Sequence, residues 1–123
     1  MLGHSPLIAF AATTNAARAR IFYEGVLGLP FVSDDPSAMV FDSNGIMLRL
    51  FKVERLAPAE HTVLGWSVAQ IEATVDALAA RGVAFERYPR MEQDARGIWT
   101  SPSGARVAWF KDPDGNILSL TQF

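Results

Sequence analysis

Few side chains in this sequence are suited to acid–base, nucleophilic or metal chemistry. The 123 residues include no cysteine, which removes disulfides, thiolate ligands and cysteine nucleophiles together. The two histidines, His4 and His61, lie just ahead of apolar segments. Glu86 and Tyr88, in the segment FERYP, are candidates for a general base or acid, but no Ser-His-Asp spacing and no glycine-rich phosphate loop accompanies them. Candidates for catalysis are therefore few.

Arg49 is the most informative charged residue, because it lies in the middle of the apolar segment IMLRLFKV. A charged group that is buried alone is costly, so the guanidinium must face water or a partner. One interpretation is a bidentate anchor for a carboxylate or phosphate on a small ligand. The other is an internal ion pair, with Glu86 as the expected partner. Both interpretations disfavour a cationic ligand.

Aromatic side chains are the second group with a possible role in binding. Trp99, Trp109 and Tyr88 lie in the last third of the chain, and Phe10 and Phe51 lie in the first half. Aromatic walls with a few polar anchors suit flat, partly apolar ligands. The alternative for each of them is that the ring only fills the hydrophobic core, and this is the role that we expect for Trp66.

The elements that must position these residues follow from hydrophobic periodicity and turn signals. Asn15 and Gly28 suit the start and the end of a first helix, Gly82 suits the end of a second, and Ser43–Gly45 reads as a hairpin turn. The order is strand, helix and three strands, and the same order then repeats. The predicted elements are strand 5–13, helix 16–27, strands 31–35, 37–43 and 46–53, strand 62–68, helix 70–81, and strands 83–89, 105–111 and 117–123.

This order is an internal repeat. An offset of 70 positions takes Gly45 to Gly115 and Arg49 to Ser119, with leucines matching on both sides of the latter pair. The helix ends match at a smaller offset, which predicts an insertion within residues 89–104. We therefore expect one domain over 1–123, with a first module over 1–53, a linker over 54–60 and a second module over 61–123.

The predicted fold is α+β: two βαβββ modules whose strands form an eight-stranded, curved, open sheet around a cleft, with the helices outside. Two modules with one helix each cannot each bury their sheet alone, and strand alternation assigns a face to each side chain. The set expected to pack on the helices is Leu7, Ala9, Leu48, Leu50, Leu64, Trp66, Leu118 and Leu120. The set expected to line the cleft is Ile8, Phe10, Met47, Arg49, Phe51, Val63, Gly65, Ser67, Ile117, Ser119 and Thr121.

Three segments carry a resemblance to a known family: ARARIFYEGVLGLPF, VAQIEATVDALAARGVAFE and WFKDPDGNILSL. With them the sequence resembles the vicinal oxygen chelate superfamily, the group of glyoxalase I, extradiol dioxygenases, fosfomycin-resistance proteins and bleomycin-binding proteins. The resemblance spans nearly the whole chain and implies the glyoxalase-like fold. It leaves the function open, since one fold hosts many chemistries.

The resemblance also implies where a divalent metal would be held. The family's enzymes take ligands from four strand positions, which fall here on Ile8, Arg49, Val63 and Ser119. None of these is a credible ligand for a metal that needs at least three N, O or S donors, so we expect no metal cofactor. A displaced site built from His4, His61 and Glu86 is the alternative, against the simpler interpretation that both histidines are exposed.

Three functional hypotheses follow. The first is a small-molecule-binding protein with a metal-free cleft, the second is a glyoxalase- or dioxygenase-type enzyme that uses the displaced histidines, and the third is a non-catalytic scaffold with a vestigial cleft. The loop 89–98 is long enough to act as a lid, although such loops are more often plain surface. The candidate cleft residues are Ile8, Phe10, Arg49, Phe51, Val63, Glu86, Tyr88, Trp99, Trp109 and Ser119.

Charge and hydropathy limit the partners. The formal net charge is −2, with both signs interspersed, which provides no electrostatic footprint for nucleic acid or an anionic membrane. The segment LIAFAA near the start is too short for a secretion signal and has no basic residues before it. We expect a cytoplasmic protein, and the resemblance implies a homodimer.

Overall fold

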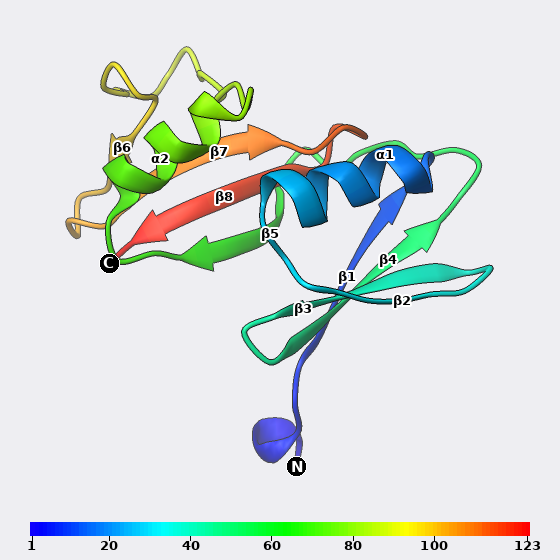
Figure 1. Ribbon diagram of the computed structural model, residues 1–123. Helices are drawn as coiled ribbons and strands as arrows, with labels where there is room; N and C mark the ends of the chain where they lie inside the picture. Colours follow the sequence, from blue (N-terminus) through cyan, green and yellow to red (C-terminus); the bar gives the residue numbers. More distant parts are fainter. The chain divides into compact units, whose positions relative to one another are not determined.

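The computed structural model describes all 123 residues, and the chain divides into two compact units, Met1–Ala57 and Pro58–Phe123. The division falls within the segment 54–60. Each unit contains one four-stranded sheet (Figure 1), and the strand order of the first sheet repeats in the second. The α+β class and the two repeated modules predicted from the sequence are thus confirmed. No helix is long and apolar enough to cross a bilayer.

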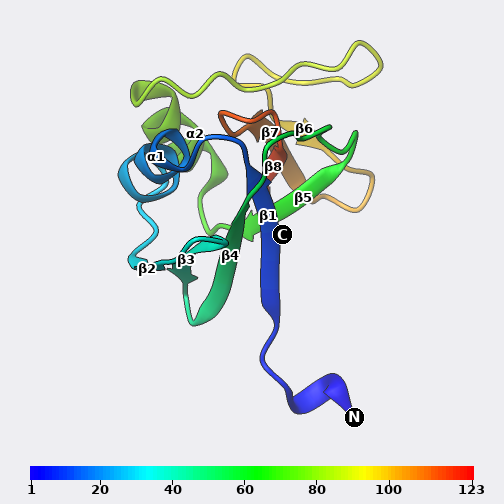
Figure 2. The same cartoon turned by 90° about the vertical axis from the view of Figure 1, so that its right-hand side faces the viewer.

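In the first unit the sheet has the order β1-β4-β3-β2, with β1 parallel to β4 and the other pairs antiparallel. The parallel pair needs a long crossover connection, which the helical segment after β1 begins. Figure 2 shows the short helix η1 set apart from the sheet at the start of the chain. The elements are η1 (Leu2–His4), β1 (Ile8–Thr13), α1 (Ala16–Arg20), η2 (Ile21–Val26), β2 (Phe31–Asp34), β3 (Ala38–Ser43) and β4 (Ile46–Lys52).

The first helical segment starts and ends at the residues that the sequence indicates, but it is not one α-helix. The Asn15 side chain accepts a hydrogen bond from the Arg18 backbone N–H at 3.1 Å, and Gly28 adopts a φ of +76°, which favours glycine. From Ile21 onward the backbone follows a π-helix. This wider turn carries the fully buried Tyr23, whose ring lies 5.8 Å from that of Phe41 on β3.

The alternation predicted for β4 is confirmed. Leu48 and Leu50 are buried on the side of the sheet that carries Phe41, whereas Arg49 between them points to the other side. Leu7 is an exception to the predicted pattern. It was expected to pack on the helix, but β1 begins only at Ile8, and Leu7 is 69% exposed.

In the second unit the order is β5-β8-β7-β6, again with one parallel pair, β5 with β8. The helix α2 lies along one face of this sheet (Figure 1) and buries Ile71, Val75 and Leu78. Leu118, Leu120, Ala108 and Phe110 are buried as well and form the sheet side of this core. Trp66, expected in the core, is only half-buried. The elements are β5 (Thr62–Ser67), α2 (Ile71–Ala80), β6 (Trp99–Thr100), β7 (Arg106–Lys111) and β8 (Ile117–Gln122).

The predicted strand over 83–89 is wrong. Only one isolated bridge forms there, between Phe85 and Phe110, together with a hydrogen bond from the Glu86 N–H to the Trp109 carbonyl at 2.8 Å. The physical reason is competition from Gln93. Its side-chain amide donates to the Glu86 carbonyl and accepts from the Tyr88 N–H, so these groups are not available to a strand ladder. The short strand β6 pairs with β7 instead.

Candidate functional site

The first candidate surface is the face of the first sheet that points away from Phe41 and the helix. We call it the Arg49 surface, and it comprises Ile8, Phe10, Met47, Arg49 and Phe51. In register, Arg49 stands between Phe10 on β1 and Val40 on β3. Neighbouring strands and alternate residues thus bring side chains from β1 and β4 onto one face.

The Arg49 surface is apolar and open. Phe10 is 52% exposed and Phe51 is 37% exposed, and their rings stack with centroids 5.8 Å apart at an interplanar angle of 11°. The guanidinium carbon of Arg49 lies 5.7 Å from the centroid of Phe51, within the range of a cation–π contact. The charge therefore lies beside exposed aromatic rings.

Arg49 makes no salt bridge within the first unit, although the register of β3 and β4 places Asp42 on the same face, opposite Met47. Asp34 pairs with Lys52 at 2.6 Å. The Asp35 carboxylate accepts the backbone N–H groups of Ala38 and Ser37, which lower the pKa of Asp35, and the charge of Arg49 adds the smallest contribution. Glu86, the partner considered from the sequence, forms its ion pair with Lys111 at 3.4 Å.

The second candidate surface lies in the second unit, on the face of its sheet opposite α2. We call it the Trp109 surface, and it comprises Gly65, Glu86, Tyr88, Trp99, Trp109, Lys111 and Ser119. The Tyr88 and Trp109 rings meet edge-on with centroids 5.6 Å apart, and those of Trp99 and Trp109 are 6.1 Å apart. Three aromatic side chains that are distant in the sequence thus form one wall.

Tyr88 is the titratable member of this wall. Burial of its ring raises the pKa of the phenol, the Glu86 carboxylate raises it further, and the Lys111 ammonium opposes this. The hydroxyl group is therefore protonated at neutral pH. A protonated hydroxyl group can donate a hydrogen bond and is no general base.

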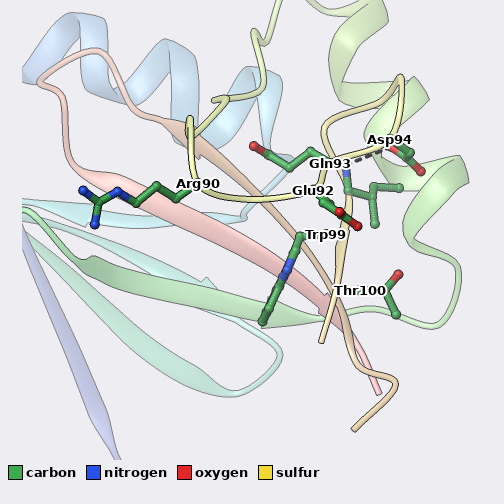
Figure 3. A pocket seen from close by; sticks show the side chains of 7 residues that line it. Arg90, Glu92, Gln93, Asp94, Trp99 and Thr100 are labelled. Carbon is green, nitrogen blue, oxygen red and sulfur yellow. Dashed lines mark hydrogen bonds between the residues drawn. The ribbon is translucent and has the colours of Figure 1, made fainter. Parts of the chain in front are cut away.

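A hollow of about 530 Å³ lies beside this wall, between the loop after Tyr88 and β6. Figure 3 shows its lining side chains, with Arg90 extending away from the acidic Glu92 and Asp94. The hollow is wide open, and its lining is mostly polar. It is lined by Arg90, Glu92, Gln93, Asp94, Ile98, Trp99 and Thr100.

The loop 89–98, considered as a lid, is tied down in the structure. The Gln93 Nε2 donates to the carbonyls of Glu86 and Gly97 at 2.9 and 2.8 Å. The Asp94 carboxylate caps a tight turn by accepting the N–H groups of residues 96 and 98. Arg96 then pairs with Asp76 on α2 at 2.9 Å, and this hydrogen bond lowers the pKa of Asp76. These contacts support a fixed wall rather than a hinged lid.

The four positions that the resemblance assigns to metal ligands do not fit a metal. Ile8 and Val63 have no donor atom, Arg49 is a cation, and only Ser119 has a hydroxyl group. His4 and His61 are both exposed and lie in different units. No group of three or more His, Asp or Glu side chains is placed to hold an ion.

The chain matches a known family over most of its length. A family model described as the Glyoxalase/Bleomycin resistance protein/Dioxygenase superfamily matches residues 7–120. The chain belongs to this superfamily. The match spans both units, which agrees with the repeated βαβββ order and with the resemblance noted from three sequence segments.

Solved structures of other superfamily members share the fold at low sequence identity. A glyoxalase family protein from Enterococcus faecalis is 18% identical, with a TM-score of 0.77 over 98% of this chain and 99% of that chain. A lactoylglutathione lyase from Agrobacterium tumefaciens is 21% identical, with a TM-score of 0.72 over 98% and 95%. A superfamily member from Sphaerobacter thermophilus is 23% identical, with a TM-score of 0.72 over 95% and 97%. No curated protein matches the sequence. These likenesses establish the fold alone.

The structure divides the ten predicted site residues between the two units. Ile8, Phe10, Arg49 and Phe51 lie together in the first unit; Val63, Glu86, Tyr88, Trp99, Trp109 and Ser119 lie in the second. Two members of the Trp109 surface were not among these ten: Lys111, which sequence reasoning missed, and Gly65, which it placed on the cleft face without making it a site candidate. Lys111 shares the strand parity of Trp109, and Gly65 is the only glycine inside a strand, a position that often marks a close approach. Both signals were present in the sequence.

Proposed function

We propose that this superfamily member binds a small anionic molecule with an aromatic or apolar part, without a metal at the family's ligand positions. The observation that carries the proposal is Arg49: a half-buried guanidinium on an open, apolar face, with no ion pair within its own unit. A carboxylate or phosphate would supply the missing counter-charge through two parallel hydrogen bonds. The exposed rings of Phe10 and Phe51 would contact the apolar part of the ligand.

The chemistry of the site supports binding over catalysis. Apart from the Asp42 carboxylate on the same face, the Arg49 surface carries no general base and no nucleophile, and the Tyr88 phenol of the second unit, whose pKa is raised, is protonated at neutral pH. Among the four positions that the resemblance assigns to metal ligands, only Ser119 offers a divalent ion a donor atom, its hydroxyl oxygen. Elemental analysis of protein purified without a histidine tag is therefore expected to find no stoichiometric metal, and one equivalent of zinc, iron or manganese would favour the displaced-histidine enzyme instead.

The test uses a pair of probes that differ only in charge. 2-Naphthoate and its neutral counterpart 2-naphthamide are titrated into the protein and followed by calorimetry and thermal shift. Arg49→Met should weaken naphthoate binding by about ten- to a hundredfold, since a hydrogen-bonded charge contributes about 1.5–3 kcal/mol. Naphthamide binding should change little.

Two further variants serve as controls. Arg55→Met removes the same charge from the exposed segment after β4 and should leave naphthoate binding unchanged. Arg49→Lys keeps the charge but loses the bidentate fork and should bind with intermediate affinity. If wild type and Arg49→Met bind naphthoate equally, Arg49 is no anion anchor and the proposed function fails.

A further inference from the structure

Gly65, in the middle of β5, has an unusual environment. A Cβ atom built on Gly65 would lie 2.7 Å from the Ser119 Oγ, closer than real Cβ contacts occur. Gly65 is not among the glycines with positive φ, so its backbone conformation does not require glycine. The absence of a side chain is instead what makes room for the hydroxyl group of Ser119, its register partner on β8.

The Ser119 hydroxyl has no hydrogen-bond partner within the protein, although the residue is only 7% exposed. No fully buried side-chain nitrogen or oxygen in the structure lacks a partner. The Ser119 Oγ must therefore keep an opening to the surface. A nearly buried hydroxyl that forms no bond is costly, and a partner from outside the chain would recover that energy.

The neighbours of this hydroxyl indicate the kind of partner. Trp109 stands directly opposite Ser119 in the antiparallel pair of β7 and β8, so the two side chains share one face. Tyr88 meets Trp109 edge-on and extends the aromatic wall. A polar floor beside an aromatic wall suits a flat molecule that carries one hydrogen-bonding group.

We propose that Ser119 and the bare backbone of Gly65 form the polar contact of a site for small aromatic carbonyl or hydroxyl compounds, whose ring lies against Trp109. This site lies in the second unit and goes beyond the proposed function, which concerns the Arg49 surface of the first unit. Gly65 acts as a specificity-determining residue, because any side chain at this position would displace the hydroxyl group.

The three tryptophans provide the readout. Spectra of ¹⁵N-labelled protein show one indole N–H signal for each of Trp66, Trp99 and Trp109, and Trp→Phe variants assign them. Benzamide, acetophenone and 2-naphthol, all uncharged, are the probes. They should shift the Trp109 signal, while Trp66, which has the opposite strand parity to Gly65, should not move.

Substitutions then test the hydroxyl group. Ser119→Ala should weaken probe binding by about three- to tenfold, the effect of one neutral hydrogen bond. Gly65→Ala should weaken it at least as much. Ser67→Ala removes another hydroxyl from the same face of β5 and should bind as the wild type does.

Two results would overturn the inference: no Trp109 shift with any of the three probes, or equal binding by Ser119→Ala and wild type. Because the probes are uncharged, these results are independent of Arg49. Naphthoate binding that depends on Arg49, without a Trp109 response to neutral probes, would uphold the proposed function and refute this inference alone. The reverse pattern would uphold the Ser119 site and refute the Arg49 anchor.

Discussion

Arg49 and Ser119 occupy equivalent positions in the two repeats, yet their surroundings differ. Arg49 lies beside the stacked rings of Phe10 and Phe51 on an open apolar face. Ser119 is nearly buried next to Gly65, and its hydroxyl group occupies the space that a side chain would fill. The repeat therefore fixes the position of each residue on its sheet, while the side chains around it decide what each can bind.

A third residue, Asp112, holds the last hairpin in shape. It is 5% exposed, and its carboxylate accepts the N–H groups of Asp114 and Asn116 and the Asn116 side-chain amide, at 2.8–3.0 Å. Asp112→Ala would leave these donors without their acceptor. We expect a loss of about 2–3 kcal/mol in the free energy of unfolding, measured with urea.

Asp112→Asn serves as the matched variant, because its carbonyl oxygen still accepts the two backbone N–H groups. We expect it to lose about half as much stability as Asp112→Ala. Equal losses in the two variants would mean that the two backbone hydrogen bonds contribute little, and that the charge together with the bond from the Asn116 side-chain amide stabilises the turn.

Among the elements, the segment between α2 and β7 differs most from the prediction. The sequence VAFERYP has the alternation and aromatic content of a strand. The side chain of Gln93, seven residues after Glu86, takes two of the backbone groups that a strand would need. The pattern of a strand reflects local preference only. It does not indicate that a side chain in the following loop will form hydrogen bonds with the backbone groups that a neighbouring strand would otherwise use.

This role of Gln93 can be tested by a minimal substitution. Gln93→Glu keeps an acceptor for the Tyr88 N–H but turns an oxygen toward the carbonyls of Glu86 and Gly97, which the amide now bonds. The loop should open more often, and hydrogen exchange at the Tyr88 amide should be at least about tenfold faster.

The neighbouring residue provides the control for this variant. Glu92→Gln makes the opposite charge change in the same loop, at a side chain that forms no hydrogen bond or ion pair, and exchange at Tyr88 should stay as in the wild type. Unchanged exchange in Gln93→Glu would show that the ion pairs of Arg96 with Asp76 and of Arg106 with Asp94 hold the loop without the amide.

At the scale of the whole chain, exposed apolar side chains are unevenly distributed. Of the large hydrophobic residues that are exposed, all but Phe123 lie in the first unit; they are Met1, Leu2, Leu7, Ile8, Phe10, Ile21, Val32, Ile46, Met47 and Phe51. Four of them, Ile8, Phe10, Met47 and Phe51, share the Arg49 surface, and exposed apolar patches mark interaction surfaces. They support the expectation of a homodimer, with the second copy contacting the first unit.

Light scattering coupled to gel filtration tests the assembly. We expect a particle of twice the 13.4 kDa of one chain. Leu7→Asp, at a side chain that is 69% exposed, should shift the equilibrium toward the monomer, whereas Phe123→Asp in the second unit should not. A wild-type mass of one chain at micromolar concentration would contradict the prediction.

The sequence by itself determined the repeated strand–helix order and, for each of Arg49, Trp109 and Ser119, the face of its own sheet on which the residue lies. These features follow from local periodicity and turn chemistry, which depend on neighbours in the chain: Asn15 caps the first helix and Gly28 and Gly82 take positive φ, as their sequence positions indicate. Residue type alone also indicated that the four positions at which the family's enzymes hold a metal are unsuited to metal ligands in this chain.

The tertiary structure decided which groups meet. The Lys111 partner of Glu86, the wall formed by Tyr88, Trp99 and Trp109, and the space that Gly65 leaves for the Ser119 hydroxyl all join residues distant in the sequence. Such contacts depend on strand register and on the shape of each neighbouring side chain, and these are set only when the sheet forms and packs.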